Sequence, residues 1–399
     1  MKQAEDLKRW LKENLHGDPI IWAVVVGLSL LSILAVYSAS GTLAYRYSET
    51  TEHYLLKHGA LVILGMVGMY YAHKLDYRYY SKLSRLGLLV AIPLLLFAYF
   101  FGPNINDSKR WIVIPLINQQ FQPSDLAKLA LIANVAAMLA KRQAKITSAN
   151  WKETLLPIMI WCGLVCGLIA LSNVSTAVIL LATCMLLMYF GRVPIKFLGA
   201  LLVVGLLAGS IALTVGSRGK TAFARIERFI DRTTLDYQTE QSFIAIANGG
   251  LFGRGMGKSH QKNFLPHPYS DFIYAVILEE YGLIGGVLVL FLYLVLLYRG
   301  MMAVASSSNA FGGLLSAGLS FLLAIQAMLN MAVAVGLVPV TGQPLPLVSM
   351  GGTSLLFTGI SFGIILSVSR GEISGSLSVT KTKNRVPPKG NVLREKQVA

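Results

Sequence analysis

The sequence predicts an all-α membrane protein with about ten transmembrane helices. Three observations support this class. Apolar residues make up 54% of the 399-residue chain and charged residues only 14%, the mean hydropathy is +0.60, and apolar runs long enough to cross a bilayer recur along the chain. A helical span needs roughly 20 mainly apolar residues. A composition of this kind is typical of polytopic membrane proteins rather than soluble ones.

The predicted spans follow one another with short connections and one long one. They cover residues 20–43, 55–73, 83–101, 124–140, 155–171, 174–190, 195–216, 271–298, 309–336 and 353–370. The seventh and eighth spans are separated by residues 217–270, which we expect to form one large loop. Residues 1–19 are expected to be a cytoplasmic segment lying at the membrane interface, and residues 371–399 a disordered basic tail.

Basic residues indicate the orientation. Lys and Arg gather before the first span, between spans two and three, between spans four and five, and after the last span, whereas the opposite short loops hold only Arg46, Lys57, Lys109 and Arg110. By the positive-inside rule both termini are cytoplasmic. The 217–270 loop then lies outside, although it carries eight basic residues, because long loops follow the rule weakly.

The formal net charge of +16 is explained by this topology and by lipid contact, so no nucleic-acid partner is expected. The three cysteines, Cys162, Cys166 and Cys184, fall inside predicted spans. A buried apolar role is expected for them, and neither a disulfide nor a metal site.

A first polar cluster lies between spans three and four. Pro123 and Ser124 begin a helix, Asp125 lies in its first turn, and Lys128 follows on the same face. Asp125 and Lys128 either form a pair facing the bundle interior, with Lys109 and Arg110 at the rim of an outward-facing cavity, or act separately. In the second case Asp125 compensates the helix dipole and Lys128 extends to the interface.

A second candidate is the glycine-rich end of the long loop, where "GMGKS" resembles the end of a phosphate-binding loop. The G-x-x-x-x-G-K-[ST] spacing fails because position 252 is Phe252, and the loop is expected outside, where ATP is absent. The glycines also miss the G-x-G-x-x-G spacing. Arg254, Lys258 and Lys262 are then either solvated charges on a structural loop or ligands of another phosphate.

Carboxylates follow at the start of the eighth span. Ser270 or Asp271 is expected to cap that helix, where the positive end of the helix dipole favours the ionised carboxylate that a general base requires. Glu279 and Glu280 lie two turns further in, and carboxylates inside an apolar helix need partners.

A third candidate is the break between spans nine and ten, rich in proline and glycine. Irregular backbone at membrane depth is tolerated where it is buried in protein or lines a cavity. The break and its flanks supply hydrogen-bonding side chains suited to a sugar-like group: Gln326, Asn330, Thr341, Ser349 and Ser354. Helix packing through small residues is the competing explanation.

These stretches together resemble the SEDS family of bacterial division and elongation glycosyltransferases. The matching motifs are "RWI" from Arg110, "QPSDLAKLA" from Gln122, "QSFIAIANGGLFGRGMGKSHQKNFLPHPYSDFIYAVILEEYGLIG" from Gln241, and "PVTGQPLPLVSMGGTS" from Pro339. One departure is Asp125, where the family usually has glutamate. The shorter side chain keeps the charge but reaches less far toward Lys128.

The resemblance implies a peptidoglycan glycosyltransferase that polymerises lipid II into glycan strands on the outer face of the cytoplasmic membrane. It assigns Asp271 as the general base for the acceptor hydroxyl, with undecaprenyl diphosphate as the leaving group. Asp125, Glu279 and Glu280 are expected as supporting charges. The expected substrate-binding residues are Arg110, Lys128, Gln241, Ser242, Lys258, Gln261, Lys262 and Ser349.

The resemblance also implies partners and a place in the cell. A class B penicillin-binding transpeptidase and other divisome membrane proteins are the expected partners. The charged N-terminal segment and basic tail favour the division member over the elongation member, which places the chain at the septum. No cofactor is assigned firmly; Mg²⁺ or Mn²⁺ is the candidate. A lipid II flippase and a non-catalytic divisome scaffold are the alternative functions.

Overall fold

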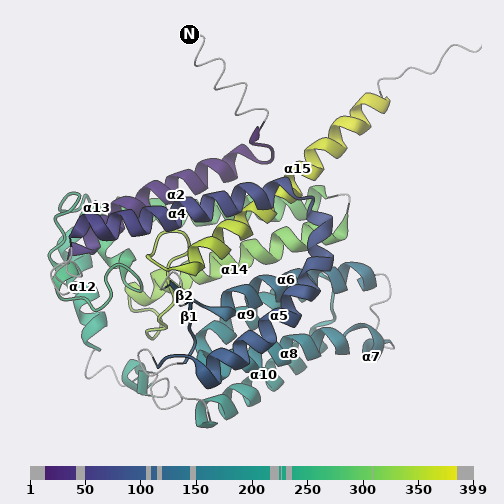
Figure 1. Cartoon of the computed structure of the whole chain (residues 1–399), viewed down its shortest axis with the longest axis horizontal. Coiled ribbons are helices and arrows are strands. Elements are labelled where there is room, and N and C mark those ends of the chain that lie inside the picture. Colours follow the sequence, from purple (N-terminus) through teal and green to yellow (C-terminus); the bar gives the residue numbers. More distant parts are fainter. Residues whose placement is uncertain are drawn as a thin grey trace, which may run out of the picture.

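The computed structural model is almost entirely helical (Figure 1). It describes residues 14–41, 50–104, 109–114, 119–143, 150–215, 224–225, 227–230, 236–307 and 309–383. The helices longer than one turn are α2 (Pro19–Ala39), α4 (Thr51–Lys74), α5 (Tyr80–Phe101), α6 (Pro123–Arg142), α8 (Leu156–Ser172), α9 (Val174–Phe190), α10 (Ile195–Val215), α12 (Tyr237–Gly249), α13 (Ile273–Ser306), α14 (Ala310–Ala334) and α15 (Thr353–Lys383). The short elements are η1 (Tyr77–Tyr79), α7 (Trp151–Thr154), η3 (Gln261–Asn263) and the strands β1 (Ile112–Ile114) and β2 (Gln119–Phe121).

An apolar helix lies at each of the ten predicted span positions, which confirms the all-α membrane class. Among the described residues, seven helices are long and apolar enough to cross a membrane. Three further apolar helices, α8, α9 and α10, occupy the fifth to seventh positions. The number of crossings and the orientation remain predictions.

Local sequence signals explain where several helices begin. Asp18 caps α2, with its carboxylate accepting from the Ile20 amide at 2.9 Å, and Pro19 follows directly. Asn173 caps α9 by accepting from the Thr176 amide at 3.2 Å, and Asn309 caps α14 by accepting from the Phe311 amide at 3.1 Å. Each side chain satisfies an amide that the helix itself leaves unpaired.

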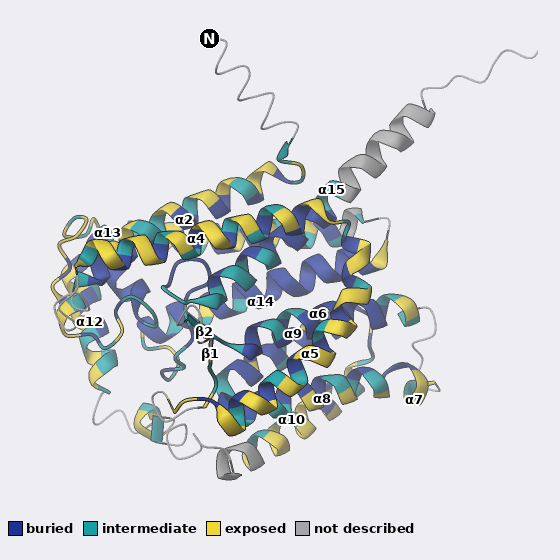
Figure 2. Cartoon of the chain, viewed as in Figure 1, coloured by how far each residue is buried: buried dark blue, intermediate teal, exposed yellow. Residues whose placement is uncertain are grey.

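Burial divides the helices into an inner and an outer group (Figure 2). In α6 and α14, 78% of the apolar window is buried, compared with 28% in α4, α5 and α13. The outer helices therefore present apolar side chains to lipid while α6 and α14 form the centre. Helices α4 and α15 approach closely through glycine: a Cβ placed at Gly359 would lie 2.1 Å from the Gly65 carbonyl oxygen.

Three expectations about secondary structure need correction. The 217–270 region is not only loop, because α12 and η3 lie within it. Helix α15 continues to Lys383, so the beginning of the predicted disordered tail is helical. A short antiparallel pair, β1 and β2, was not anticipated; Ile112 pairs with Phe121 in it. Residues 1–13 of the expected interfacial segment 1–19 and residues 384–399 of the expected tail 371–399 lie outside the described residues.

Candidate functional site

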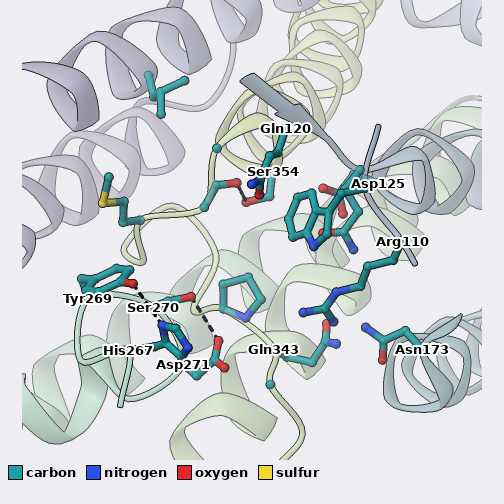
Figure 3. A pocket seen from close by; sticks show the side chains of 18 of the residues that line it. Arg110, Gln120, Asp125, Asn173, His267, Tyr269, Ser270, Asp271, Gln343 and Ser354 are labelled. Atoms are coloured by element: carbon teal, nitrogen blue, oxygen red, sulfur yellow. Dashed lines mark hydrogen bonds between the residues drawn. The ribbon is translucent and has the colours of Figure 1, made fainter. Parts of the chain in front are cut away.

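A cavity of about 370 Å³ collects polar side chains from segments far apart in the sequence (Figure 3). The β1–β2 region contributes Arg110 and Gln120, and the first turns of α6 contribute Asp125 and Lys128. The segment before α13 contributes His267, Tyr269, Ser270 and Asp271; the α14–α15 break contributes Gln343 and its neighbours. The break therefore lines a cavity, as its irregular backbone predicted.

Asp125 and Lys128 form an ion pair inside the protein. The Lys128 Nζ lies 2.8 Å from the Asp125 Oδ1, and the two residues are only 8% and 5% exposed. Lys128 therefore does not extend to the interface, and the hypothesis of an interior pair is confirmed. The other carboxylate oxygen, Asp125 Oδ2, is buried with no hydrogen-bond partner among the described residues. It is an acceptor that a bound group can use.

Asp271 is not the helix cap that the sequence predicted. Helix α13 begins at Ile273, after Phe272 in the cap position, and the cap side chain makes no hydrogen bond. Instead the Asp271 carboxylate lies against the cavity, where its Oδ1 accepts from the Ser270 hydroxyl at 3.0 Å (Figure 3). Because the carboxylate does not serve the helix end, it is available to a ligand.

The backbone that carries Asp271 is held by the α14–α15 region. The Asn330 amide donates to the Asp271 carbonyl at 2.9 Å, and the Ser349 hydroxyl donates to the Ser270 carbonyl at 2.6 Å. The Met350 amide donates to the Tyr269 carbonyl at 2.9 Å. Ser349 and Asn330 were expected to bind a ligand, but the Ser349 hydroxyl and the Asn330 amide nitrogen position this segment instead.

Arg110 is the cation whose surroundings are most unusual. Burial lowers the pKa of its guanidinium below the usual value, and the positive charge of Arg225 lowers this pKa further. The negative charge of Asp271 acts in the opposite direction and raises the pKa. Its Nε is buried with no partner among the described residues. Arg110 thus keeps a donor for a ligand, in the field of the cavity carboxylates. The sequence did not indicate that Arg225 influences Arg110, because Arg225 belongs to none of the motifs described above.

Amide side chains form a further part of the cavity wall. Gln326 donates to the Pro344 carbonyl at 3.0 Å, and Gln343 donates to the Thr176 hydroxyl at 2.9 Å. Asn173, whose carbonyl oxygen caps α9, has its Nδ2 donor buried without a partner in the described part of the chain. The sequence singled out Gln326 and Ser354, which do line the cavity, but missed Asn173 and Gln343. Asn173 could have been identified from the polar pair Ser172 and Asn173, which interrupts two apolar runs.

Several predicted substrate-binding residues lie elsewhere. Ser242 is fully buried on α12 and donates to the Ala334 carbonyl at 2.7 Å, so it packs α12 against α14. Gln241 and Gln261 do not line this cavity in the described structure. Lys258 and Lys262 line a second, open cavity of about 430 Å³, and the two cavities share none of their described lining residues. In the described structure these lysines therefore line a different cavity from Arg110 and Lys128.

Glu279 and Glu280 explain that separation. The Glu279 carboxylate accepts from the Ser259 hydroxyl at 2.5 Å and from the amides of His260 and Gln261 at 3.0 and 3.1 Å. Glu280 accepts from the Ser38 hydroxyl and from the Ser259 amide. The partners that the two buried carboxylates required thus come from the glycine-rich loop and from Ser38 on α2. These bonds fasten the loop to α13 away from Asp271.

The donor set does not form a metal cage made by the protein alone. Within the described ranges, no three His, Cys, Asp or Glu side chains come together, and Asp125 is already engaged by Lys128.

Comparison with known proteins places these features in a family. A family model for FtsW, RodA and SpoVE, described as "Cell cycle protein", matches residues 18–373. The "Probable peptidoglycan glycosyltransferase FtsW" of Geobacter metallireducens is 33% identical over 364 residues, which are 90% of this chain and 96% of the relative. "Stage V sporulation protein E" of Bacillus subtilis is 33% identical over 368 residues, 88% of this chain and 97% of that protein.

A solved structure has the same fold. It is described as "Structural coordination of polymerization and crosslinking by a peptidoglycan synthase complex", and it matches with a TM-score of 0.69 at 25% identity, covering 89% of this chain and 98% of its own. Because the match covers most of both chains, the overall arrangement of the helices is shared.

Proposed function

This chain belongs to the FtsW, RodA and SpoVE family of cell cycle proteins, and from that membership we propose that it is a peptidoglycan glycosyltransferase. The substrate is lipid II, which the enzyme polymerises into glycan strands on the outer face of the bacterial cytoplasmic membrane. The observation that carries the proposal is the cavity in which Asp271, Arg110 and the Asp125–Lys128 pair meet.

Asp271 acts as the general base. The 4-hydroxyl of the acceptor sugar attacks the anomeric carbon of the donor, its proton passes to the Asp271 carboxylate, and the bond from the anomeric carbon to the diphosphate oxygen breaks. A positioned base of this kind contributes roughly 10²–10⁴-fold to a rate. The Ser270 hydroxyl, which hydrogen-bonds to Oδ1, fixes the orientation of the carboxylate.

The cations of the cavity stabilise the leaving group. Undecaprenyl diphosphate departs with negative charge, and the guanidinium of Arg110 and the ammonium of Lys128 stabilise that charge as it develops. Lys128 is oriented by Asp125 at 2.8 Å. The amide wall formed by Asn173, Gln326 and Gln343 suits the hydroxyl and acetamido groups of the sugars.

Its relatives support a partner and a site of action for this chain. The structural relative is described in terms of polymerization and crosslinking by one complex, which supports a class B penicillin-binding transpeptidase as partner. Relatives named FtsW support a role in septal synthesis with other divisome membrane proteins. The chain is a multi-pass membrane protein, and the division septum is its proposed location.

The test is an Asp271→Asn substitution, which removes the base with little change in volume. Purified protein, with its partner transpeptidase, is incubated with lipid II, and glycan strands are resolved by gel electrophoresis. We expect at least a roughly 100-fold loss of polymerisation. The control is Asp236→Asn, because Asp236 pairs with Arg228 outside this cavity. Normal polymerisation by Asp271→Asn would overturn the assignment and return the flippase and scaffold alternatives to consideration.

A further inference from the structure

The loop after α12 exposes large apolar side chains that the glycosyl-transfer site does not use. Leu251, Phe252, Met256 and Phe264 are 53%, 78%, 57% and 56% exposed. A water-facing loop seldom shows several such side chains together, so the cluster marks an interaction surface. We define the 251–264 surface as these four residues together with the cations that lie among them.

The exposure is not a consequence of a loose backbone. The Arg254 amide donates to the Glu279 carbonyl at 2.9 Å, and the Gly255 amide donates to the Glu280 carbonyl at 3.0 Å. The buried Glu279 carboxylate accepts hydrogen bonds from the amides of residues 260 and 261. A rigid support therefore presents the apolar side chains outward.

This surface continues the outer face of α13. The Leu283 amide donates to the Gly250 carbonyl at 3.0 Å, and the Ile284 amide donates to the Leu251 carbonyl at 3.3 Å. Leu283, Ile284, Val287 and Leu288 are themselves 53–55% exposed on an apolar membrane helix. Since these α13 side chains face lipid, the adjoining Leu251 and Phe252 extend the lipid-facing surface onto the loop.

Positive charge lies beside the apolar side chains. Arg254, Lys258 and Lys262 line the open cavity of about 430 Å³. The two nearby carboxylates, Glu279 and Glu280, are 0% and 1% exposed, whereas Arg254 and Lys258 are exposed. Lys262 Nζ donates to the Gly257 carbonyl at 2.9 Å and to the Ser38 hydroxyl at 3.3 Å. Arg254 Nη1 also lies 3.6 Å from the Glu279 Oε1. The two carboxylates therefore lie beneath the exposed cations Arg254 and Lys258.

We propose that the 251–264 surface is a lipid-binding site, in which the four apolar side chains enter the outer leaflet and Arg254, Lys258 and Lys262 bind the phosphate of an anionic phospholipid headgroup. Apolar side chains flanked by Lys and Arg are the combination that membrane interfaces select. The occupant is a bulk phospholipid rather than the lipid-linked substrate, because this cavity shares no described lining residue with the one that holds Asp271.

The first experiment measures membrane contact. A cysteine introduced at Phe252 is labelled with an environment-sensitive fluorophore, and the protein is reconstituted with lipids carrying doxyl quenchers. The native Cys162, Cys166 and Cys184 are buried, so labelling is selective. We expect quenching as strong as that of the same label at Phe291, which is 59% exposed on α13. Quenching no stronger than at the exposed Asn104 would overturn the proposal.

The second experiment measures headgroup binding. Detergent-purified protein is titrated with phosphatidylglycerol, phosphatidylcholine or undecaprenyl diphosphate, and retained lipids are counted by native mass spectrometry. The Lys258→Gln/Lys262→Gln variant is expected to retain less phosphatidylglycerol than the wild type and the same amount of the other two lipids. The matched control is Lys82→Gln/Arg85→Gln, which removes two exposed cations from α5. Unchanged phosphatidylglycerol binding, or loss of undecaprenyl diphosphate instead, would overturn the assignment.

Discussion

At the scale of single residues, the Asp271 carboxylate accepts from the Ser270 hydroxyl, while side chains from other elements hold its main chain. Asn330 is the clearest of these. Its amide donates both to the Asp271 carbonyl at 2.9 Å and to the Gln343 carbonyl at 2.8 Å. It therefore links the proposed base to the amide wall of the same cavity, and it acts by positioning rather than by touching substrate.

We predict that Asn330→Ala lowers kcat about 10–100-fold with a smaller effect on KM, since a small displacement of a catalytic group can reduce a rate about 100-fold. The readout is the concentration dependence of lipid II polymerisation. Asn134→Ala is the matched control, because Asn134 is also buried but its amide donates only a weak bond to the Met138 sulfur. Equal losses in both variants would point to general destabilisation and contradict a positioning role.

At the scale of elements, the interruption of α13 at Gly282 determines where the glycine-rich loop lies. Gly282 has φ 68° and ψ −169°, a conformation essentially confined to glycine. A Cβ at this position would lie 2.4 Å from the Gly253 amide nitrogen and from the Leu251 carbonyl oxygen. The kink at Gly282 and the backbone of residues 251–253 are therefore in direct contact, and this contact leaves no room for a side chain at position 282.

We predict that Gly282→Ala destabilises the protein by at least about 1–3 kcal/mol, measured as a lower thermal unfolding temperature in detergent. Gly163→Ala on α8 is the control, because a Cβ there meets nothing within 4 Å. Alanine at a helical glycine is expected to be neutral or stabilising by about 0.5–1 kcal/mol. A Gly282→Ala protein as stable as the control would mean that the kink is not required.

At the scale of the whole molecule, the inner helices α6 and α14 carry or adjoin the polar groups of the cavity, and the outer helices separate them from lipid (Figure 2). This arrangement explains how an ion pair such as Asp125–Lys128 persists in a membrane protein. Charges inside a bundle are tolerated when they are paired and shielded, and they are usually functional. The position of the cavity relative to the two sides of the membrane depends on the predicted orientation.

We predict that a cysteine at the exposed Asn248 on α12 is labelled by a membrane-impermeant maleimide in intact cells, whereas a cysteine at the exposed Lys82 is labelled only after the membrane is opened. The buried native cysteines keep the background low. The opposite pattern would invert the topology and exclude a cavity that opens outward.

The sequence alone predicts the membrane class and the positions of the apolar helices, and it offers the Asp125–Lys128 pair as one of two hypotheses. Hydropathy is a property of consecutive residues, and residues three apart on one helix meet wherever that helix packs. Contiguous motifs also sufficed for family membership, since the family model matches the region that contains them.

Which polar residues share a cavity depends on how the helices pack. Lys258 and Asp271 lie close in sequence, yet they belong to different cavities, because Glu279 and Glu280 bind the intervening loop. Asn173 and Gln343 join Asp271 from distant segments, through contacts that no local pattern encodes. Buried carboxylates require hydrogen-bond donors, and the donors they select depend on how the helices pack.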